Sequence, residues 1–324
     1  MQVIDPKSFT VIATYPTGRE PQHVVPSWDM KTLWVNDDLG NNMVPINPIT
    51  GMPGKPVNVE DPYNLYFTPD GAHGLVMAER LGRIDVHNPQ TMAFERSLAV
   101  PCDGVNHADY SRDLSFFVAS CEFSGKLLVV ERNATKLISV IDLNNTKTPG
   151  ATSPAEAMRM GGAKSGLTPG ASAMPQDVRL SPDGTWFLVA DMLRNGIWVI
   201  SASTRKVERF IRTGMGAHGI YPARDGRHIF VSNRDEGSVS VLDASSLAIT
   251  ATRRIPGGGS PDMGGVSADG SQLWLSGRYN SEVYVFDTAT GALIRRIKVN
   301  AGPHGLLVWP QPGSYSLGHT GNMR

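Results

Sequence analysis

By length alone, a chain of 324 residues predicts about two domains. Its 30 Lys and Arg side chains balance 30 Asp and Glu side chains, and neither sign is clustered in blocks. This balance argues against a surface that binds nucleic acid or an anionic membrane, so we expect neither as a partner. The chain also lacks an apolar stretch of the roughly 18 residues that a transmembrane helix needs.

The N-terminal residues Met1–Asp5 already have the pattern of a strand. They lack the basic region and the apolar region of a secretory leader. The sequence as written therefore predicts a cytoplasmic protein. If a leader has been removed, the protein would be periplasmic or secreted.

One pattern recurs along the chain: a short apolar run, a turn of the type Ser-Pro-Asp-Gly, and a second apolar run that ends in polar residues. The turn positions are separated by 41, 43, 70, 42, 44 and 42 residues, and they are Asp29, Asp70, Asp113, Asp183, Asp225, Asp269 and Gln311. A period of this size with strand patterning indicates one four-stranded blade per repeat. We therefore predict an all-β fold, a seven-bladed β-propeller that forms a single domain over residues 1–324.

The two ends of the chain are predicted to share the seventh blade. Met1–Ile4 and Thr10–Tyr15 have strand patterns, and the last repeat supplies only Leu306–Trp309 and Tyr315–Gly318. Together these four segments, within residues 1–18 and 301–324, would complete the blade. The N-terminal strands would thereby close the ring without leaving an unpaired edge in that blade.

A long insertion at about residues 144–174 separates the third and fourth repeats. It is rich in Gly, Ala, Ser, Pro and Met, and it precedes an innermost strand, so we expect it on the face where the central channel opens. Connections of this length are usually functional lids or disordered segments, and the sequence favours neither. The third repeat also holds both cysteines, Cys102 and Cys121, which either form a disulfide or remain two free thiols.

Two positions begin the innermost strand of each repeat, at the mouth of the predicted channel. Four of the eight histidines occupy these positions: His23, His107, His218 and His304. Imidazoles that converge from separate blades are common ligands of transition metals. Methionines near the same mouth favour copper, with zinc or iron second, unless they serve only packing: Met174, Met192, Met215 and Met263. We predict a metal site with the four histidines as ligands; the alternative is a polar channel that binds only water.

A second set of positions ends the second strand of each repeat, at the same face. These residues are acidic in four repeats and basic in the next two: Asp37, Glu79, Glu122, Asp191, Arg234 and Arg278, with His319 in the last repeat. The predicted channel is therefore acidic on one side and basic on the other. Salt bridges between neighbouring side chains are the alternative explanation of these charges.

Catalytic and binding roles follow from these two sets of positions. The carboxylates predicted to transfer protons or to support the metal ligands are Glu79, Glu122, Asp177 and Asp262. The residues predicted to bind a small anionic substrate are Arg234, Arg278, Tyr63 and Asn64.

Several segments resemble the YVTN-repeat, YncE-like bacterial propellers. Ser238–Asp243 and Glu282–Gly291 are similar to that family's third-strand signature, and Ala217–Gly219 and Pro303–Gly305 are similar to its entry into the innermost strand. The resemblance implies a seven-bladed propeller but no particular activity. A more distant likeness to the selenium-binding protein and methanethiol oxidase propellers would imply copper and thiol oxidation, with no residue carried over.

The leading hypothesis is a metal-dependent enzyme acting on a small anionic molecule in the central funnel. With copper the chemistry would be redox, whereas zinc would indicate a lyase or hydrolase. The alternatives are a non-catalytic propeller that binds a peptide, polymer or protein, and a metal carrier.

Overall fold

A computed structural model describes residues 1–146, 166–319 and 323–324. Strands β1 to β26 account for all of the regular secondary structure in these ranges, and no described residue lies in a helix. Accordingly, the described part of the chain contains no helix with the length and apolar character needed to cross a membrane. The all-β prediction is confirmed.

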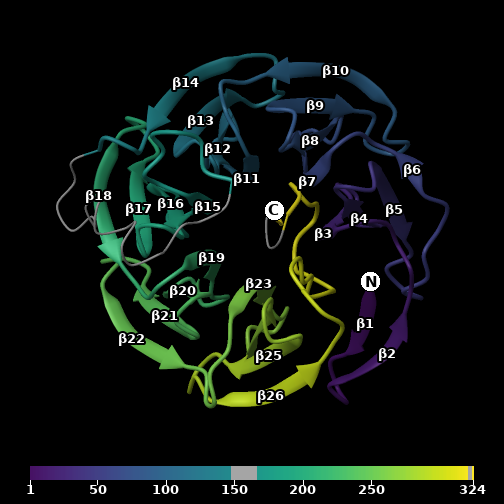
Figure 1. Cartoon of the computed structure of the whole chain (residues 1–324), viewed down its shortest axis with the longest axis vertical. Coiled ribbons are helices and arrows are strands. Elements are labelled where there is room, and N and C mark those ends of the chain that lie inside the picture. The colour runs from purple at the N-terminus through teal and green to yellow at the C-terminus, as the bar shows by residue number, and fades with distance from the viewer. Residues whose placement is uncertain (147–165, 320–322) are drawn as a thin grey trace. The chain divides into compact units, whose positions relative to one another are not determined.

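The described strands form one sheet of two strands and six sheets of four (Figure 1). The two-stranded sheet consists of β1 (Gln2–Asp5) and β2 (Thr10–Thr14). The first three four-stranded sheets are β3 (Pro21–Pro26), β4 (Leu33–Asp37), β5 (Asn42–Ile46), β6 (Val57–Asn58); β7 (Pro62–Phe67), β8 (Gly74–Ala78), β9 (Arg83–His87), β10 (Phe94–Ala99); and β11 (Val105–Tyr110), β12 (Phe116–Cys121), β13 (Lys126–Glu131), β14 (Leu137–Asp142). The last three are β15 (Pro175–Leu180), β16 (Trp186–Asp191), β17 (Gly196–Ser201), β18 (Val207–Arg212); β19 (Ala217–Pro222), β20 (His228–Asn233), β21 (Ser238–Asp243), β22 (Ile249–Arg254); and β23 (Pro261–Val266), β24 (Gln272–Gly277), β25 (Glu282–Asp287), β26 (Leu293–Lys298). In each of the six, neighbouring strands follow the order of the chain, which is the topology of a propeller blade.

The sheet β15–β18 illustrates why the repeat folds as a blade. Successive side chains of β16 point to opposite faces, and both faces are buried: Phe187 and Val189 pack in one apolar cluster, Leu188 and Ala190 in another. This explains the continuous apolar runs of the inner strands. At the turn between β15 and β16, Gly184 adopts a positive φ of 74°, a conformation that favours glycine.

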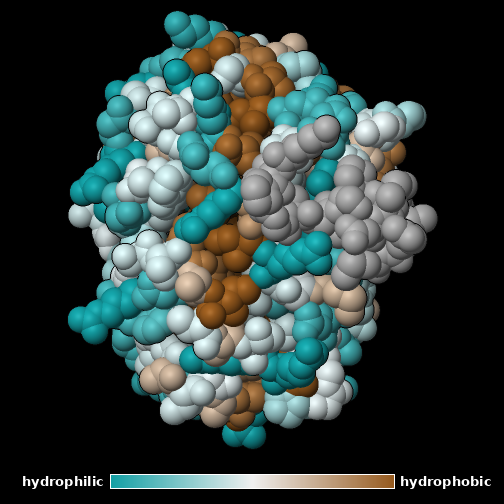
Figure 2. Space-filling view, turned by 90° about the vertical axis from the view of Figure 1, so that its left-hand side faces the viewer, coloured by the Kyte–Doolittle hydropathy of each residue, from teal (hydrophilic) through white to brown (hydrophobic). Residues whose placement is uncertain are grey.

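The outermost strands contribute only one face to the core. Half-buried and exposed residues alternate along β14, so that Ile138 and Val140 point outward and are exposed. On the face shown in Figure 2, hydrophobic residues gather in a vertical band between hydrophilic ones. The solvent side of the molecule therefore retains apolar surface.

The described chain packs as two compact units. The first unit comprises Met1–Ala78, Asp85–Ser97 and Pro261–Arg324, and the second comprises Glu79–Ile84 and Leu98–Ser260. The prediction of one domain over residues 1–324 with a closed ring stays a prediction.

Six of the seven predicted blades are four-stranded sheets in the described residues, and the seventh has regular strands only in β1 and β2. Within the first unit, β1 and β2 pair with each other, and Leu306–Trp309 packs in the same layer without being a regular strand. Tyr315–Gly318, predicted as the second strand of this blade, instead lies against β7, where Gly318 bridges Tyr66. The physical reason is composition: Tyr-Ser-Leu-Gly has one aliphatic side chain, whereas a second strand must bury both of its faces.

The insertion is described only at its two ends, because residues 147–165 lie outside the described residues. The buried guanidinium of Arg194 joins these ends: it donates to the carbonyl of Ser172 at 2.9 Å and to that of Asn144 at 3.0 Å. The second unit therefore holds the two ends of the insertion together, while the lid or disorder alternatives for its middle stay open.

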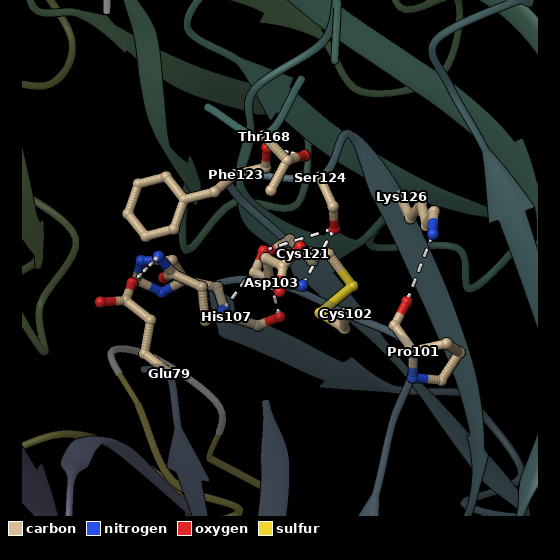
Figure 3. Close-up of a disulfide and its surroundings, with 12 residues drawn as sticks. Glu79, Pro101, Cys102, Asp103, His107, Cys121, Phe123, Ser124, Lys126 and Thr168 are labelled. Carbon is tan, nitrogen blue, oxygen red and sulfur yellow. Dashed lines mark hydrogen bonds between the residues drawn. A yellow bond between two sulfur atoms is a disulfide. The ribbon is translucent and has the colours of Figure 1, made fainter. Parts of the chain in front are cut away.

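A disulfide joins Cys102 and Cys121, with 5.4 Å between their Cα atoms (Figure 3). Both residues are buried, and Cys121 ends β12. Nearby, the hydroxyl of Ser124 accepts the N–H of Asp103 at 3.1 Å. These two contacts join the loop before β11 to the end of β12. Of the two alternatives that the sequence left open, a disulfide or two free thiols, the structure contains the disulfide.

We predict that replacing both cysteines with serine, C102S together with C121S, lowers the free energy of unfolding by about 3 kcal/mol. The disulfide joins residues that are 19 positions apart, and closing this loop lowers the entropy of the unfolded chain. Urea denaturation with and without dithiothreitol measures the effect. The wild type should become less stable under reductant, whereas the double variant should not respond. Equal urea midpoints for the two proteins would show that the disulfide contributes nothing.

Candidate functional site

The innermost strands share an irregularity at their N-terminal ends. In all six four-stranded sheets, the pairing of the first strand with the second shifts register within the first few residues. Such bulges leave residues out of the regular ladder and redirect their side chains. The two positions at which the sequence placed the histidines fall at these irregularities, which explains why they can carry functional groups.

At three of these bulges, the hydroxyl of a serine on the second strand accepts a hydrogen bond from a backbone N–H of the first strand. The hydroxyl of Ser120 accepts the N–H of His107 at 3.1 Å, and Ser232 accepts that of Gly219 at 2.8 Å. Ser276 does the same for Met263 at 3.2 Å. Because these amides are buried, the serine hydroxyls stabilise a backbone that the ladder cannot satisfy.

In the first unit, three histidines lie together. The ring of His23, at the start of β3, is 4.9 Å from that of His304 and 4.3 Å from that of His319, centroid to centroid. Tyr63 of β7 completes the cluster, 5.3 Å from His23. All four side chains are buried. We call His23, His304, His319 and Tyr63 the first histidine group.

Asp262 at the start of β23 orients one member of this group. Its Oδ2 lies 2.8 Å from Nδ1 of His304, while Nε2 of His304 lies 3.5 Å from the hydroxyl of Tyr63. The guanidinium of Arg278 is 3.9 Å from the same carboxylate oxygen, and 29% of its side chain is exposed. Asp262 is therefore a positioning residue, and Arg278 brings positive charge and solvent access beside the group.

His319 reaches the first histidine group through the C-terminal segment. The N–H of His319 donates to the carbonyl of Leu65, and the N–H of Phe67 donates to that of Leu317, so this segment pairs with β7. In Figure 1 the C-terminal segment passes β3 and ends near β7. The sequence placed His319 in the second set of positions but not among the metal ligands, because that pairing is not encoded locally.

In the second unit, the amide of Asn106 holds two predicted catalytic carboxylates. Its Nδ2 lies 3.1 Å from Oε1 of Glu79 and 2.6 Å from Oε2 of Glu122. Figure 3 shows Glu79 near His107 and the disulfide. The structure thus brings Glu79 and Glu122 together, through an asparagine whose role the sequence did not reveal.

The other two predicted metal ligands, His107 and His218, also lie in the second unit, with ring centroids 6.4 Å apart. Oδ1 of Asp177 lies 4.0 Å from Nδ1 of His107. The other oxygen of Asp177 accepts from Nε of Arg179 at 3.2 Å and from the N–H of Ile220 at 2.9 Å. Burial raises the pKa of Asp177 to about 6, against the opposing charge of Arg179.

The remaining predicted residues have local partners. Arg234 is buried, and its guanidinium contacts the sulfur of Met192 at 3.4 Å. Met192 packs with Met174 and Leu193 in an apolar cluster, while Met215 is exposed. In the first unit, Asn64 is buried and donates to the hydroxyl of Tyr66 at 3.3 Å.

Asp191 and Asp37 show that strand-end acids can also serve the fold. Asp191 accepts the indole N–H of Trp198 at 2.9 Å and the backbone N–H groups of Met174 and Arg194. Asp37 at the end of β4 is buried, and burial raises its pKa to about 6 although the neighbouring Thr17, Gly18 and N-terminal amine lower it. Asp37 is thus a titratable group of the first unit whose protonation favours the folded state.

A match to a known protein family supports the resemblance drawn from the repeats. Residues 166–312 match the model of the YNCE-like β-propellers, which confirms the predicted likeness over that range. No curated protein matches the chain significantly.

Solved structures with the same architecture include proteins of different kinds. Hydrazine synthase from Kuenenia stuttgartiensis has a TM-score of 0.68 and 16% sequence identity, with 91% of each chain covered. A functionally unknown protein from Desulfotomaculum acetoxidans has a TM-score of 0.67 and 14% identity, covering 94% of this chain and 95% of its own. Streptogramin B lyase has a TM-score of 0.68 and 13% identity, covering 91% and 89%. At these identities the comparisons establish the propeller fold alone.

We predict that the substitution D37N flattens part of the pH dependence of stability. The pKa of Asp37 is about 6 in the folded protein, compared with 3.8 for an ordinary aspartate. Between pH 3.8 and about 6, Asp37 is therefore protonated in the folded state and ionised in the unfolded state. The wild type should therefore lose stability, relative to D37N, as the pH rises from about 4 to 6, and the difference should stay constant above that range. Urea unfolding at several pH values measures this, and parallel curves would contradict it.

Proposed function

We propose that this protein, a β-propeller whose residues 166–312 match the YNCE-like family, is a transition-metal-dependent enzyme acting on a small anionic molecule. Copper is our first choice of metal, with zinc or iron second. Bound copper would supply redox chemistry, and zinc would instead supply Lewis-acid chemistry for a lyase or hydrolase.

The observation that carries this proposal is the first histidine group. His23, His304 and His319 come from three separate segments, yet in a buried setting the ring centroids of His304 and His319 lie 4.9 and 4.3 Å from that of His23. A ring nitrogen of His23 also lies within 4.8 Å of one of His319, which is close enough for both to bind one ion. Imidazole nitrogens suit copper, zinc and iron. We propose these three residues as the ligands, with His107 and His218 as a second candidate pair in the other unit.

The donor set passes a simple chemical test. A metal-ligating histidine usually donates its second ring N–H to a carboxylate, which sets the tautomer and holds the ring. His304 has this arrangement, because Asp262 lies 2.8 Å from its Nδ1 and leaves Nε2 directed toward Tyr63. Asp177 lies near His107 in a similar way, but the distance from its Oδ1 to Nδ1 of His107 is longer, at 4.0 Å.

Arg278 supports an anionic substrate at the first histidine group. Its partly exposed guanidinium lies beside Asp262 at 3.9 Å, so the arginine retains N–H donors for a carboxylate or a thiolate. In the second unit, Asn106 positions Glu79 and Glu122, and we propose these two as a pair that shares and transfers protons.

We predict that protein purified without added metal contains about one transition-metal ion per chain, and that the double variant H23A with H304A loses it, because two imidazole ligands are removed. Elemental mass spectrometry measures the metal. The control is H228A, which removes an exposed histidine that pairs with Asp225 at 2.9 Å. A metal-free wild type, or equal loss in H228A, would overturn the proposed centre.

Asp262 offers a finer test of the same centre. The variant D262N should weaken metal affinity by about 10- to 100-fold, since the amide holds His304 less firmly. Titration with a competing chelator measures the affinity, and full occupancy at saturating metal would confirm that the ligands remain. Unchanged affinity in D262N would rule out the positioning role of Asp262.

We predict that R278Q lowers kcat/KM for the anionic substrate about 10- to 100-fold, because a charge-assisted hydrogen bond is lost. Turnover of a panel of thiols and small carboxylates identifies the substrate. R295Q is the matched control, since Arg295 packs over the ring of Phe9. A metal-loaded protein that turns over no member of the panel would favour a carrier, and equal effects of both variants would contradict the role of Arg278.

A further inference from the structure

The incomplete seventh blade contains a cavity. It has a volume of about 530 Å³ and lies in the first unit, lined by Gln2–Asp5 of β1 on one side and by Leu306–Trp309 on the other. The neighbouring sheets supply the remaining walls, through residues such as Val35 and Ile46 of one sheet and Trp274 and Val283 of the other. This volume is within the usual range for ligand sites, about 300 to 1,000 Å³.

The two sides of the cavity occupy the places of a first and a third strand. Alternate side chains of Leu306–Trp309 pack on opposite sheets: Leu306 and Val308 on β23–β26, Leu307 and Trp309 on β3–β6. Ile4 of β1 packs on β23–β26 as well. In Figure 1, β1 and β2 lie between β5 and β26, with the C-terminal segment farther inward. The position between them is that of a second strand, and in this blade the described chain does not fill it.

Both sides of this position offer backbone groups that have no partner among the described residues. No hydrogen bond of those residues reaches the backbone N–H of Leu306, Leu307 or Trp309. Because successive N–H groups of an extended segment point to opposite edges, either that of Leu306 or those of Leu307 and Trp309 can face the position. Among the described strands, β1 pairs with β2 alone and therefore along one edge. An apolar small molecule would fill the volume but would leave these groups unsatisfied, whereas an extended peptide offers both donors and acceptors.

The other six sheets indicate which peptide would fit. Each of their second strands contains three consecutive buried apolar residues: Leu33–Val35, Leu75–Met77, Phe117–Ala119, Phe187–Val189, Ile229–Val231 and Leu273–Leu275. The cavity lining matches this chemistry, because Asp5 is the only Lys, Arg, Asp or Glu among the described residues that line it, and His23 and His304 add two imidazoles at its inner end. The fitting segment is therefore extended, apolar on both faces and uncharged at its centre.

We propose that the cavity binds such a segment of another polypeptide as the missing second strand of the seventh blade. Main-chain hydrogen bonds from β1 and Leu306–Trp309 would hold it, and the two flanking sheets would bury its side chains. The partner is thus a protein with an exposed or disordered apolar strand. Because His23 and His304 also line the cavity, the bound segment would lie beside the first histidine group, but its main-chain hydrogen bonds would not require a bound metal.

The experiment uses the whole chain and a fluorescent peptide that carries the order of Phe187–Ala190, Phe-Leu-Val-Ala, between lysine-containing ends. Fluorescence anisotropy should show saturable binding. Three control peptides should bind at least about tenfold more weakly: one N-methylated at alternate residues, one with proline replacing leucine, and one with aspartate replacing leucine.

Hydrogen–deuterium exchange locates the binding site. The amides of residues 306–309, and those of residues 2–5 that point away from β2, should exchange rapidly in the free protein and become protected by the peptide, while those of β7 should not change. Equal binding of the N-methylated peptide without protection would mean that the cavity is an apolar small-molecule pocket, and the proposal would be wrong. Absence of peptide binding, or protection confined to other residues, would overturn it equally.

Discussion

Burial of both faces of the inner strands is the constraint on which this structure depends. In β16, Phe187 packs in one apolar cluster and Leu188 in another, and successive residues of β4 alternate between two clusters in the same way. A strand of this kind must carry consecutive apolar residues, because neither face meets water. The apolar runs recur in the sequence because every blade needs such a strand. Tyr315–Gly318 lacks consecutive apolar residues and therefore does not form a second strand.

The candidate sites exist because the constraint is relaxed at the ends of the strands. There the ladder breaks into bulges, serine hydroxyls satisfy the freed amides, and polar side chains replace apolar ones. Buried polar groups are stabilised by hydrogen bonds, and in each unit a buried carboxylate lies beside one of the histidines. Asp262 meets this need closely at His304, and Asp177 stands near His107.

The seventh blade combines both effects. Its outer strands β1 and β2 are regular, and Leu306–Trp309 packs as an inner strand does, but the apolar segment that would join them is missing. The C-terminal segment is diverted to the edge of β7, where it contributes His319 to the first histidine group. One change in the path of the chain therefore places His319 beside His23 and leaves the cavity between β1 and Leu306–Trp309.

Local residue order determined much of this protein. Apolar runs with intervening Asp-Gly turns were sufficient to predict the all-β fold, the strands of six blades and the positions of His23 and His304, because strand and turn preferences act over a few residues. Tertiary structure alone decided the Cys102–Cys121 disulfide, the place of His319 and the link between Glu79 and Glu122 through Asn106. These features depend on which distant segments pack together, and that choice is made by the burial of whole sheets rather than by any short stretch of sequence.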